Sequence, residues 1–414
     1  MLIPLQTLGE TLAVILAGGV GSRLHPLTAD RAKPAVPFGG VYRIIDFTLS
    51  NCLHSGLRRI LVLTQYKSHS LHQHLRDGWS IFNPELGEFI TVVPAQMRTG
   101  AEWYAGTADA IYQNRYLLER HAPKYVLILC GDHVYRMDYA RMLEEHVERE
   151  FDVTVACMPV PLDRARSCGV MEVDRDLRVR SFQEKPENPL PMPEDPTHAR
   201  ASLGIYVFNL PFLLQTLAQD NIDKSSSHDF GKNILPHIII SHRVGAYRFG
   251  GMKDRVAHDG YWRDVGTLDA YYEANMDLLK PIPPINLYQK DWPVRTYQGQ
   301  YPGARTAFSS SGEPATVTNT ILAGGDIIVG GRVIHSILSP DVRIDEEAMV
   351  RDSILFQGVR IGAEARLKRC IVDKNILIPP KESIGYNPDS DRERFTVSEG
   401  GVVVVAKGYR FPAS

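Results

Sequence analysis

The chain has 414 residues, of which 44% are hydrophobic and 23% are charged, and its formal net charge is −2. This length predicts two domains, and the near-neutral charge argues against a protein that binds nucleic acid or a membrane surface. No stretch is apolar enough to predict a signal peptide or a membrane span, so we expect a cytoplasmic protein. The five scattered cysteines lack a Cys-x-x-Cys pair and predict neither a disulfide framework nor a zinc site.

The first two thirds of the chain alternate strand-like and helix-like segments. Continuous apolar runs cover residues 12–16, 60–64, 125–130 and 153–158, and helical patterns cover 107–119 and 139–149. This alternation predicts an α/β fold, a Rossmann-like domain with a mostly parallel sheet, over residues 1–280. Because such sheets bind ligands beyond the carboxyl ends of their strands, residues directly after a strand are the first candidates for a site.

A glycine-rich loop follows the first predicted strand. Its glycines, Gly18, Gly19 and Gly21, let the backbone turn sharply and bring its N–H groups close to an anion. Three basic residues follow at short range: Arg23, Arg31 and Lys33. These residues predict a cradle for the phosphates of a nucleoside triphosphate, although an ordinary strand-to-helix turn with solvated charges stays open. Neither the P-loop pattern nor the dinucleotide-binding pattern fits the loop.

Two acidic residues stand near the ends of strand-like runs at distant points of the chain. Asp132 follows the run 125–130 and a glycine, and Asp264 precedes a similar glycine. Each alone could be a turn or cap residue. Two carboxylates and the phosphates of a substrate are together sufficient to hold Mg²⁺. Asp132 and Asp264 therefore predict a magnesium site.

The composition changes after residue 279. Residues 281–304 are rich in proline and have neither a strand nor a helix period, which predicts a linker. In the region 305–414, apolar residues recur about every six positions, with one slip of a single residue: Ile344, Val350, Phe356, Ile361 and Leu367. This spacing is typical of a left-handed parallel β-helix, with a β-sandwich as the alternative.

The glycine loop and the basic segment that follows it resemble the signature of a known family. The string Gly-Gly-Val-Gly-Ser-Arg-Leu at 18–24 and the string Arg-Ala-Lys-Pro-Ala-Val-Pro-Phe-Gly-Gly at 31–40 closely resemble the signature of the sugar-nucleotide pyrophosphorylases. Within them, the chain resembles the bacterial glucose-1-phosphate adenylyltransferases. The resemblance implies that ATP and α-D-glucose 1-phosphate give ADP-glucose and pyrophosphate, with Mg²⁺, in glycogen synthesis. It also implies a homotetramer, and it favours the C-terminal β-helix over the sandwich.

The resemblance further implies roles for individual residues of the nucleotide site. It assigns Arg23, Lys33 and Asp132 to catalysis, with the two basic side chains on the triphosphate, and it places Gln96 and Tyr104 at the adenine. For Tyr104 the residue chemistry alone would favour packing of the loop before a helix.

Two further sites are implied by the same resemblance. A glucose 1-phosphate pocket would contain Gly169, Glu184, Lys185 and Ser202, with Lys185 on the phosphate and Glu184 and Ser202 on sugar hydroxyls. Anionic metabolites regulate the family, and the candidate residues for such effectors are Arg43 and Arg58.

Some alternatives stay open. Asp30 stands where many relatives of this family carry a basic residue, so the identity of the effector is not predicted. The enzyme could use UTP or dTTP, or the chain could be a catalytically inactive regulatory subunit. The inactive subunit is disfavoured by the joint retention of Arg23, Lys33, Asp132, Lys185 and Asp264. We interpret Asp229 as a structural helix cap.

Overall fold

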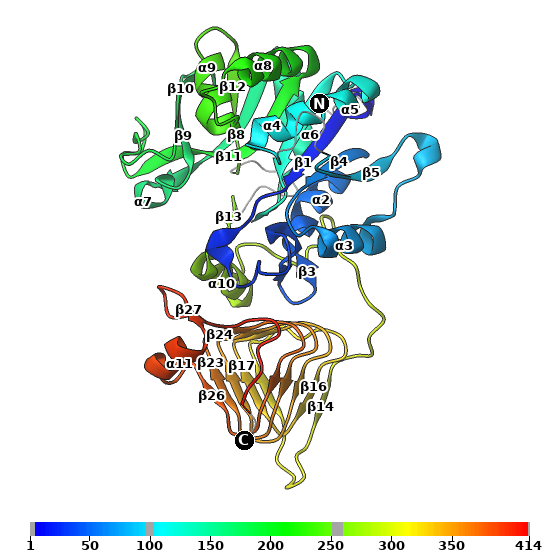
Figure 1. The fold of residues 1–414 in the computed structure, drawn as a ribbon, viewed down its shortest axis with the longest axis vertical. Helices are drawn as coiled ribbons and strands as arrows, with labels where there is room; N and C mark the ends of the chain where they lie inside the picture. The colour runs from blue at the N-terminus through cyan, green and yellow to red at the C-terminus, as the bar shows by residue number, and fades with distance from the viewer. Residues whose placement is uncertain (1–4, 97–102, 251–259, 413–414) are drawn as a thin grey trace.

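The structure, a computed structural model, describes residues 5–96, 103–250 and 260–412. Figure 1 shows an α/β domain from the N-terminal part of the chain and, below it in this view, a β-helix from the C-terminal part. The predicted α/β fold followed by a parallel β-helix is thereby confirmed. Among the described helices, none combines the length and the apolar character that a membrane crossing requires.

A nine-stranded sheet is the centre of the α/β domain, in the order β10-β9-β11-β6-β1-β4-β5, with β8 between β11 and β12. The run β6-β1-β4-β5 is parallel, as predicted, whereas β11 lies antiparallel to β6 and β8. The strands are β1 (Thr11–Ala17), β4 (Arg59–Thr64), β5 (Phe89–Pro94), β6 (Tyr125–Cys130), β8 (Val153–Pro161), β9 (Gly169–Val173), β10 (Val179–Glu184), β11 (His198–Asn209) and β12 (Val244–Arg248).

Helices cover both faces of this sheet, which is why its central strands are continuous apolar runs. Along β1, Leu12 and Val14 join the core on one face, and Ala13 and Ile15 join the core on the other. The first core is covered by α4 (Thr107–Gln113), α5 (Arg115–His121), α8 (Leu210–Ile222) and α9 (Leu235–Ile238). The second is covered by α2 (Ile44–His54), α3 (His69–Trp79) and α6 (Tyr139–Glu148). The other α-helices among the described residues of this domain are α1 (Leu5–Gly9), α7 (Leu162–Ala165) and α10 (Leu268–Met276).

The helix predicted over 107–119 is two helices, α4 and α5, which meet at Asn114. The side-chain amide of Asn114 donates to the carbonyl of Ala110 at 2.8 Å and to the hydroxyl of Tyr104 at 2.9 Å. A side chain that takes a backbone carbonyl in this way competes with the helical hydrogen bonds and ends the first helix.

Two short two-stranded sheets lie outside the main sheet. One pairs β2 (Pro37–Phe38) with β3 (Tyr42–Arg43), and the other pairs β7 (His133–Tyr135) with β13 (Trp262–Asp264), both antiparallel. The second of these sheets joins a segment after β6 to a segment far along the chain.

The segment 281–304 contains no helix or strand. It nevertheless packs on the α/β domain, because Ile285 and Trp292 are fully buried and the indole N–H of Trp292 donates to Asn51 Oδ1 in α2 at 3.1 Å. The segment therefore lies along the surface of α2 on its way to the β-helix.

Three sheets of parallel strands form the sides of the β-helix. The first contains β14 (Arg305–Ala307), β16 (Ile327–Val329), β19 (Arg343–Ile344), β22 (Arg360–Ile361) and β25 (Leu377–Ile378). The second contains β15 (Thr316–Thr318), β17 (Arg332–Ile334), β20 (Met349–Arg351), β23 (Arg366–Lys368) and β26 (Ser383–Ile384). The third contains β18 (Ile337–Leu338), β21 (Ile354–Leu355), β24 (Cys370–Val372), β28 (Val403–Val405) and the antiparallel β27 (Thr396–Val397), and α11 (Pro388–Arg394) precedes it.

The coils of the β-helix explain the spacing of its apolar residues. Ile344 pairs with Ile361, and Ile361 with Ile378, so one three-sided coil takes 17 residues. Two sides of six residues and one of five give the six-residue spacing with a slip of one. Of the residues that carry this spacing, Ile344, Val350, Ile361 and Leu367 are buried in the interior of the β-helix. Phe356 is instead buried in the core that includes residues of the α/β domain, and its neighbour Leu355 takes the inward place.

Candidate active site

The site lies at the carboxyl ends of β1 and β6, the place where a parallel sheet binds its ligands. The two strands are neighbours in parallel register, with Leu16 opposite Cys130. The glycine loop leaves the end of β1, and Gly131 and Asp132 leave the end of β6. The amide of Gly131 donates to the carbonyl of Leu16 at 3.0 Å, so the two exits are tied together.

The glycine loop is closely packed at Gly21. This residue has a φ of 64°, in the left-handed region, and a Cβ here would lie 3.1 Å from Thr28 Cγ2 and 3.2 Å from Lys33 Cβ. Only glycine therefore fits without strain or displacement. Beyond Gly21, the short helical turn Ser22–Leu24 carries Arg23. A Cβ added to Gly266 would lie only 3.2 Å from Arg23 Nη2, so the guanidinium packs closely on this glycine.

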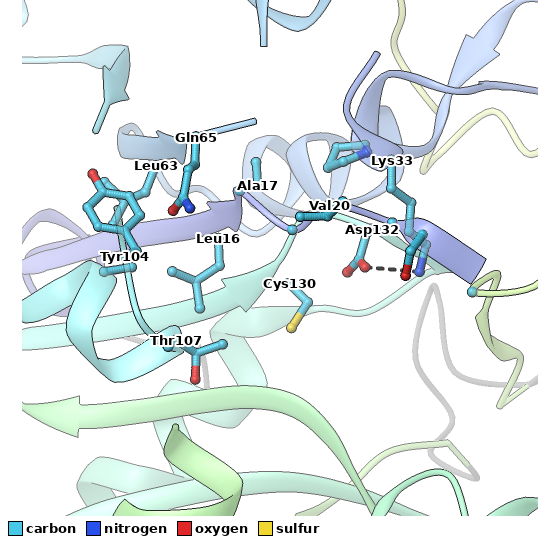
Figure 2. A pocket seen from close by; sticks show the side chains of 18 of the residues that line it. Leu16, Ala17, Val20, Lys33, Leu63, Gln65, Tyr104, Thr107, Cys130 and Asp132 are labelled. Carbon is cyan, nitrogen blue, oxygen red and sulfur yellow. Dashed lines mark ion pairs between the residues drawn. The ribbon is translucent and has the colours of Figure 1, made fainter. Parts of the chain in front are cut away.

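Lys33 lies between the two predicted metal-binding acids. Its Nζ is 2.9 Å from Asp132 Oδ2 and 2.8 Å from Asp264 Oδ1. The antiparallel pairing of β7 with β13 creates this arrangement, because Asp264 stands opposite His133, the residue after Asp132. Two acids that are far apart in the sequence thus share one ammonium group. Figure 2 shows Lys33 beside Asp132, and a dashed line marks the ion pair of these two residues.

The charges of Lys33, Asp132 and Asp264 shift one another's pKa values. Burial alone would raise the pKa of Asp132, but the charge and the hydrogen bond of Lys33 outweigh it and lower that pKa to about 2. The pKa of Asp264 is lowered for the same reasons. Burial would lower the pKa of Lys33, and the two carboxylates overcome this effect and raise it. All three groups are therefore ionised at neutral pH.

The donor set at this point suits a hard divalent cation. Both carboxylates are ionised, and Lys33 hydrogen-bonds one oxygen of each, Asp132 Oδ2 and Asp264 Oδ1. Asp132 Oδ1 stays available beside His133 Nε2, at 3.5 Å. Carboxylate oxygens are the protein ligands that Mg²⁺ prefers, with substrate phosphates and waters completing its shell. Asp132 and Asp264 are therefore the residues that would hold it.

A cavity of about 500 Å³ opens at these strand ends. Figure 2 shows Tyr104 at one end of it and Lys33 with Asp132 at the other. Of the residues predicted for the nucleotide, those that line the cavity are Gly18, Gly19, Gly21, Arg23, Lys33, Tyr104 and Asp132. The expected place of Arg31 in the phosphate cradle is wrong, because its side chain is buried against Asp373 of the β-helix and is not among the described lining residues. Gln96 is not among its described lining residues, and its Oε1 accepts a long hydrogen bond of 3.4 Å from the hydroxyl of Tyr116. The cavity thus offers an aromatic end and a charged end.

The four residues predicted for the sugar phosphate gather around β9, β10 and β11. Gly169 stands opposite Glu184 in the β9–β10 pair, and a Cβ on Gly169 would lie 3.0 Å from Glu184 Oε2. Lys185 Nζ lies 3.1 Å from Glu184 Oε1 and the lysine side chain is 57% exposed. Ser202, in β11 beside β9, accepts a hydrogen bond of 3.3 Å from the amide of Gly204. These four residues lie outside the described lining of the cavity at Lys33.

The two predicted effector residues are separated in the structure. Arg43 lines a second cavity, of about 720 Å³, to which the β-helix contributes Lys374. Its guanidinium donates to the carbonyl of Ser70 at 2.7 Å. Arg58 instead lies at the end of α2, where it donates to the carbonyls of Leu53 at 2.8 Å and Leu57 at 3.1 Å. Arg58 is not among the described residues that line this cavity.

Sequence reasoning did not single out every residue of the first cavity. Asp229 caps the helical turn Phe230–Ile234, as interpreted, through the amides of Gly231 at 2.9 Å and Lys232 at 3.1 Å. It also lines the cavity and accepts a hydrogen bond of 3.1 Å from Thr107 Oγ1. The local sequence predicts that Asp229 caps a helix, but no sequence pattern predicts that this helical turn lies next to α4.

Comparisons with known proteins agree with this geometry. Residues 12–281 match the family described as Nucleotidyl transferase, and residues 302–405 match the family described as GlmU-like, C-terminal hexapeptide. The chain is 60% identical to glucose-1-phosphate adenylyltransferase 2 of Vibrio cholerae over 97% of this chain and 99% of that protein. It is 52% identical to the glucose-1-phosphate adenylyltransferase of Rhodopirellula baltica, over 96% of this chain and 90% of that protein. For the corresponding enzyme of Methylococcus capsulatus the identity is 50%, over 96% of this chain and 93% of that protein.

The family match covers most of the chain, and the relatives are similar over nearly their full length. A shared fold alone would not produce sequence identity this high. Both findings agree with the resemblance carried by residues 18–24 and 31–40. The chain belongs to the glucose-1-phosphate adenylyltransferase family of nucleotidyl transferases.

Proposed function

We propose that this chain transfers the adenylyl group of ATP to α-D-glucose 1-phosphate, giving ADP-glucose and pyrophosphate, as a regulated step of bacterial glycogen synthesis. The observation that carries the proposal is the position of Lys33 between Asp132 and Asp264, beside the glycine loop. Relatives that are 50–60% identical to the chain carry the name of this enzyme.

The reaction needs no general base, because the phosphate of glucose 1-phosphate is already anionic. One of its oxygens attacks the α-phosphorus of ATP, and the bond from that phosphorus to the bridging oxygen of pyrophosphate breaks. The barrier comes from repulsion between two phosphates and from charge on the leaving pyrophosphate. We therefore assign catalysis to positioning and electrostatic stabilisation.

The residues of the first cavity divide this work. The backbone N–H groups at Gly18, Gly19 and Gly21, with Arg23, bind the triphosphate, and Lys33 adds its positive charge where the phosphates meet. Tyr104 lies at the other end of the cavity and contacts the adenine. Gln96 stays a prediction for the adenine site, since its link to that site rests on the resemblance alone.

Asp132 and Asp264 would hold a divalent cation, which we propose to be Mg²⁺. When bound, it supplies neutralisation of the phosphate charge. The two carboxylates have a second task in the chain itself, which is to orient the ammonium group of Lys33.

Glucose 1-phosphate occupies the neighbouring site of Gly169, Glu184, Lys185 and Ser202. Lys185 is exposed enough to reach an incoming phosphate, and Glu184 is held by the lysine at 3.1 Å. The carboxylate of Glu184 then accepts hydrogen bonds from sugar hydroxyls, and the hydroxyl of Ser202 donates or accepts one.

The second cavity is our candidate site for an anionic effector. Arg43 and Lys374 line it from the two domains, so an anion there would contact both. Arg58 stays a separate prediction. Assaying ADP-glucose synthesis with fructose 6-phosphate, fructose 1,6-bisphosphate and pyruvate identifies the effector.

The remaining expectations extend the resemblance. We propose a division into a catalytic domain at 1–280, a linker at 281–304 and a β-helix domain at 305–414, in a cytoplasmic homotetramer. The matches over 12–281 and 302–405 support this division.

Pyrophosphate release in the presence of ATP and glucose 1-phosphate tests the function, with and without Mg²⁺. We expect release only with both substrates and the cation. Parallel reactions with UTP and dTTP at the same concentration test the nucleotide. Faster release with UTP or dTTP than with ATP would refute the adenylyl assignment, and no release with any nucleotide would make the chain the inactive subunit.

A further inference from the structure

A buried ion pair joins the two domains next to the catalytic loop. Arg31 Nη2 lies 2.8 Å from Asp373 Oδ1, and the two side chains are only 6% and 1% exposed. Arg31 belongs to the loop that carries Lys33, and Asp373 follows β24 of the β-helix directly. The β-helix therefore contacts the catalytic loop through a charge that is hidden from water.

Asp373 is a fixed point. Its amide donates to the carbonyl of Val405 at 3.0 Å, which continues the pairing of β24 with β28. Its Oδ1 also accepts a hydrogen bond of 2.6 Å from the amide of Lys374. The carboxylate that receives Arg31 is thus held by the ladder of the β-helix.

The chain between Arg31 and Lys33 transmits this position. A single residue, Ala32, separates them, and its amide donates to the carbonyl of Lys67 at 3.2 Å. The turn Lys33–Ala35 is closed by a hydrogen bond of 2.9 Å from the amide of Ala35 to the carbonyl of Ala32. Because only one residue, itself held by two backbone hydrogen bonds, separates Arg31 from Lys33, a displacement of Arg31 also displaces Lys33.

Arg31 has strong reasons to move if Asp373 loses its charge. A guanidinium stays protonated at any physiological pH, and a buried charge without a partner is costly. Its Nη1 is already buried with no hydrogen-bond partner among the described residues. Neutral Asp373 would leave this cation facing the positive Arg43 and Lys374, which lie close by.

From this geometry we propose that Asp373 is a positioning residue for adenylyl transfer. Through Arg31, the β-helix holds the loop that places Lys33 between Asp132 and Asp264. The proposal rests on the proposed function, because it assumes that Lys33 contacts the triphosphate. It gives the β-helix a part in binding ATP, although no residue of the β-helix is among the described residues lining the ATP cavity.

The test measures the dissociation constant of Mg·ATP by equilibrium dialysis, without glucose 1-phosphate, and the two KM values in the synthesis reaction. The variants are Asp373→Asn, which removes the charge and keeps the shape, and Arg31→Met with Asp373→Leu, which removes both charges together. The matched control is Tyr272→Phe, which loses another contact between the domains, a hydrogen bond of 2.7 Å from the hydroxyl to the carbonyl of Asp352.

We expect Asp373→Asn to weaken ATP binding and to raise the KM for ATP at least fivefold, with the KM for glucose 1-phosphate within twofold of the wild-type value. A merely smaller folded fraction would leave both KM values unchanged. The double variant should stay impaired, because an apolar pair no longer fixes the loop, and Tyr272→Phe should bind ATP normally. The proposal is wrong if Asp373→Asn binds ATP like the wild type, or if the double variant regains wild-type affinity. A wild-type protein that does not bind ATP would instead refute the proposed function.

Discussion

Asp264 stands opposite His133 in the antiparallel pair of β13 and β7, and this register brings its carboxylate to the ammonium group of Lys33, 2.8 Å away. Asp132, one residue before His133, reaches the same ammonium group from the other side at 2.9 Å. A short ribbon outside the main sheet thus assembles the charged end of the nucleotide cavity. The predictions below test what this end and its surroundings do.

Replacing Asp132 by asparagine should lower turnover by about 100-fold or more, since the site loses a charge that orients Lys33 and holds the cation. Initial rates of pyrophosphate release at saturating ATP, glucose 1-phosphate and Mg²⁺ measure the effect. Asp389→Asn is the matched control, because this side chain is 94% exposed on α11 and should leave the rate unchanged. A normal rate in Asp132→Asn would remove this residue from the catalytic machinery.

Lys185→Ala should raise the KM for glucose 1-phosphate by about 10-fold or more and change the KM for ATP little, because Lys185 lies at the candidate sugar-phosphate site. Lys381→Ala supplies the control, a lysine of the β-helix that is 73% exposed and pairs with Glu364. Steady-state kinetics with each substrate varied in turn separates the two constants. An unchanged KM for glucose 1-phosphate would end the assignment of Lys185.

The sequence predicted the elements of the site better than the contacts between them. Apolar runs located β1 and β6, and the acids near the strand ends followed from local pattern. The pairing of Asp132 with Asp264 at one site was predicted from the chemistry of a metal site. The ion pairs of Lys33 with both acids could not be predicted, because Lys33 lies 231 positions before Asp264 and no local rule fixes the register of β7 with β13. The division of 107–119 at Asn114 was also missed, since helix periodicity does not register a side-chain amide that competes for a backbone carbonyl.

Binding of an anion in the second cavity should weaken as the pH rises through about 8. Burial, followed by the positive charges of Arg43 and Arg31, lowers the pKa of Lys374 to about 8. The negative charge of Asp373 raises this pKa in part, and the positive charge of Lys407 lowers it further. Lys374 is therefore charged below this pH and neutral above it, and an anion prefers the charged form.

Sulfate is a suitable probe for this effect, because its own charge is constant over this range. If only charged Lys374 binds it, affinity at pH 9 should be about 10-fold lower than at pH 7, as isothermal titration calorimetry can measure. Lys374→Arg is the control, because arginine stays charged and should keep the affinity at pH 9. Equal losses in both proteins would assign the pH dependence to another group.

Gly21→Ala should abolish tight ATP binding, because two costs coincide at this residue. Its φ of 64° strains any side chain, and the new Cβ would press on Thr28 and on Lys33 at 3.1 and 3.2 Å. Gly87→Ala separates the two costs, since Gly87 has a φ of 74° but nothing within 4 Å of its Cβ position. Both variants should lose about 1–2 kcal/mol of stability to backbone strain, measured by urea unfolding. Only Gly21→Ala should also lose ATP affinity, and comparable ATP binding in the two variants would show that the packing of Gly21 on Lys33 has no part in the nucleotide site.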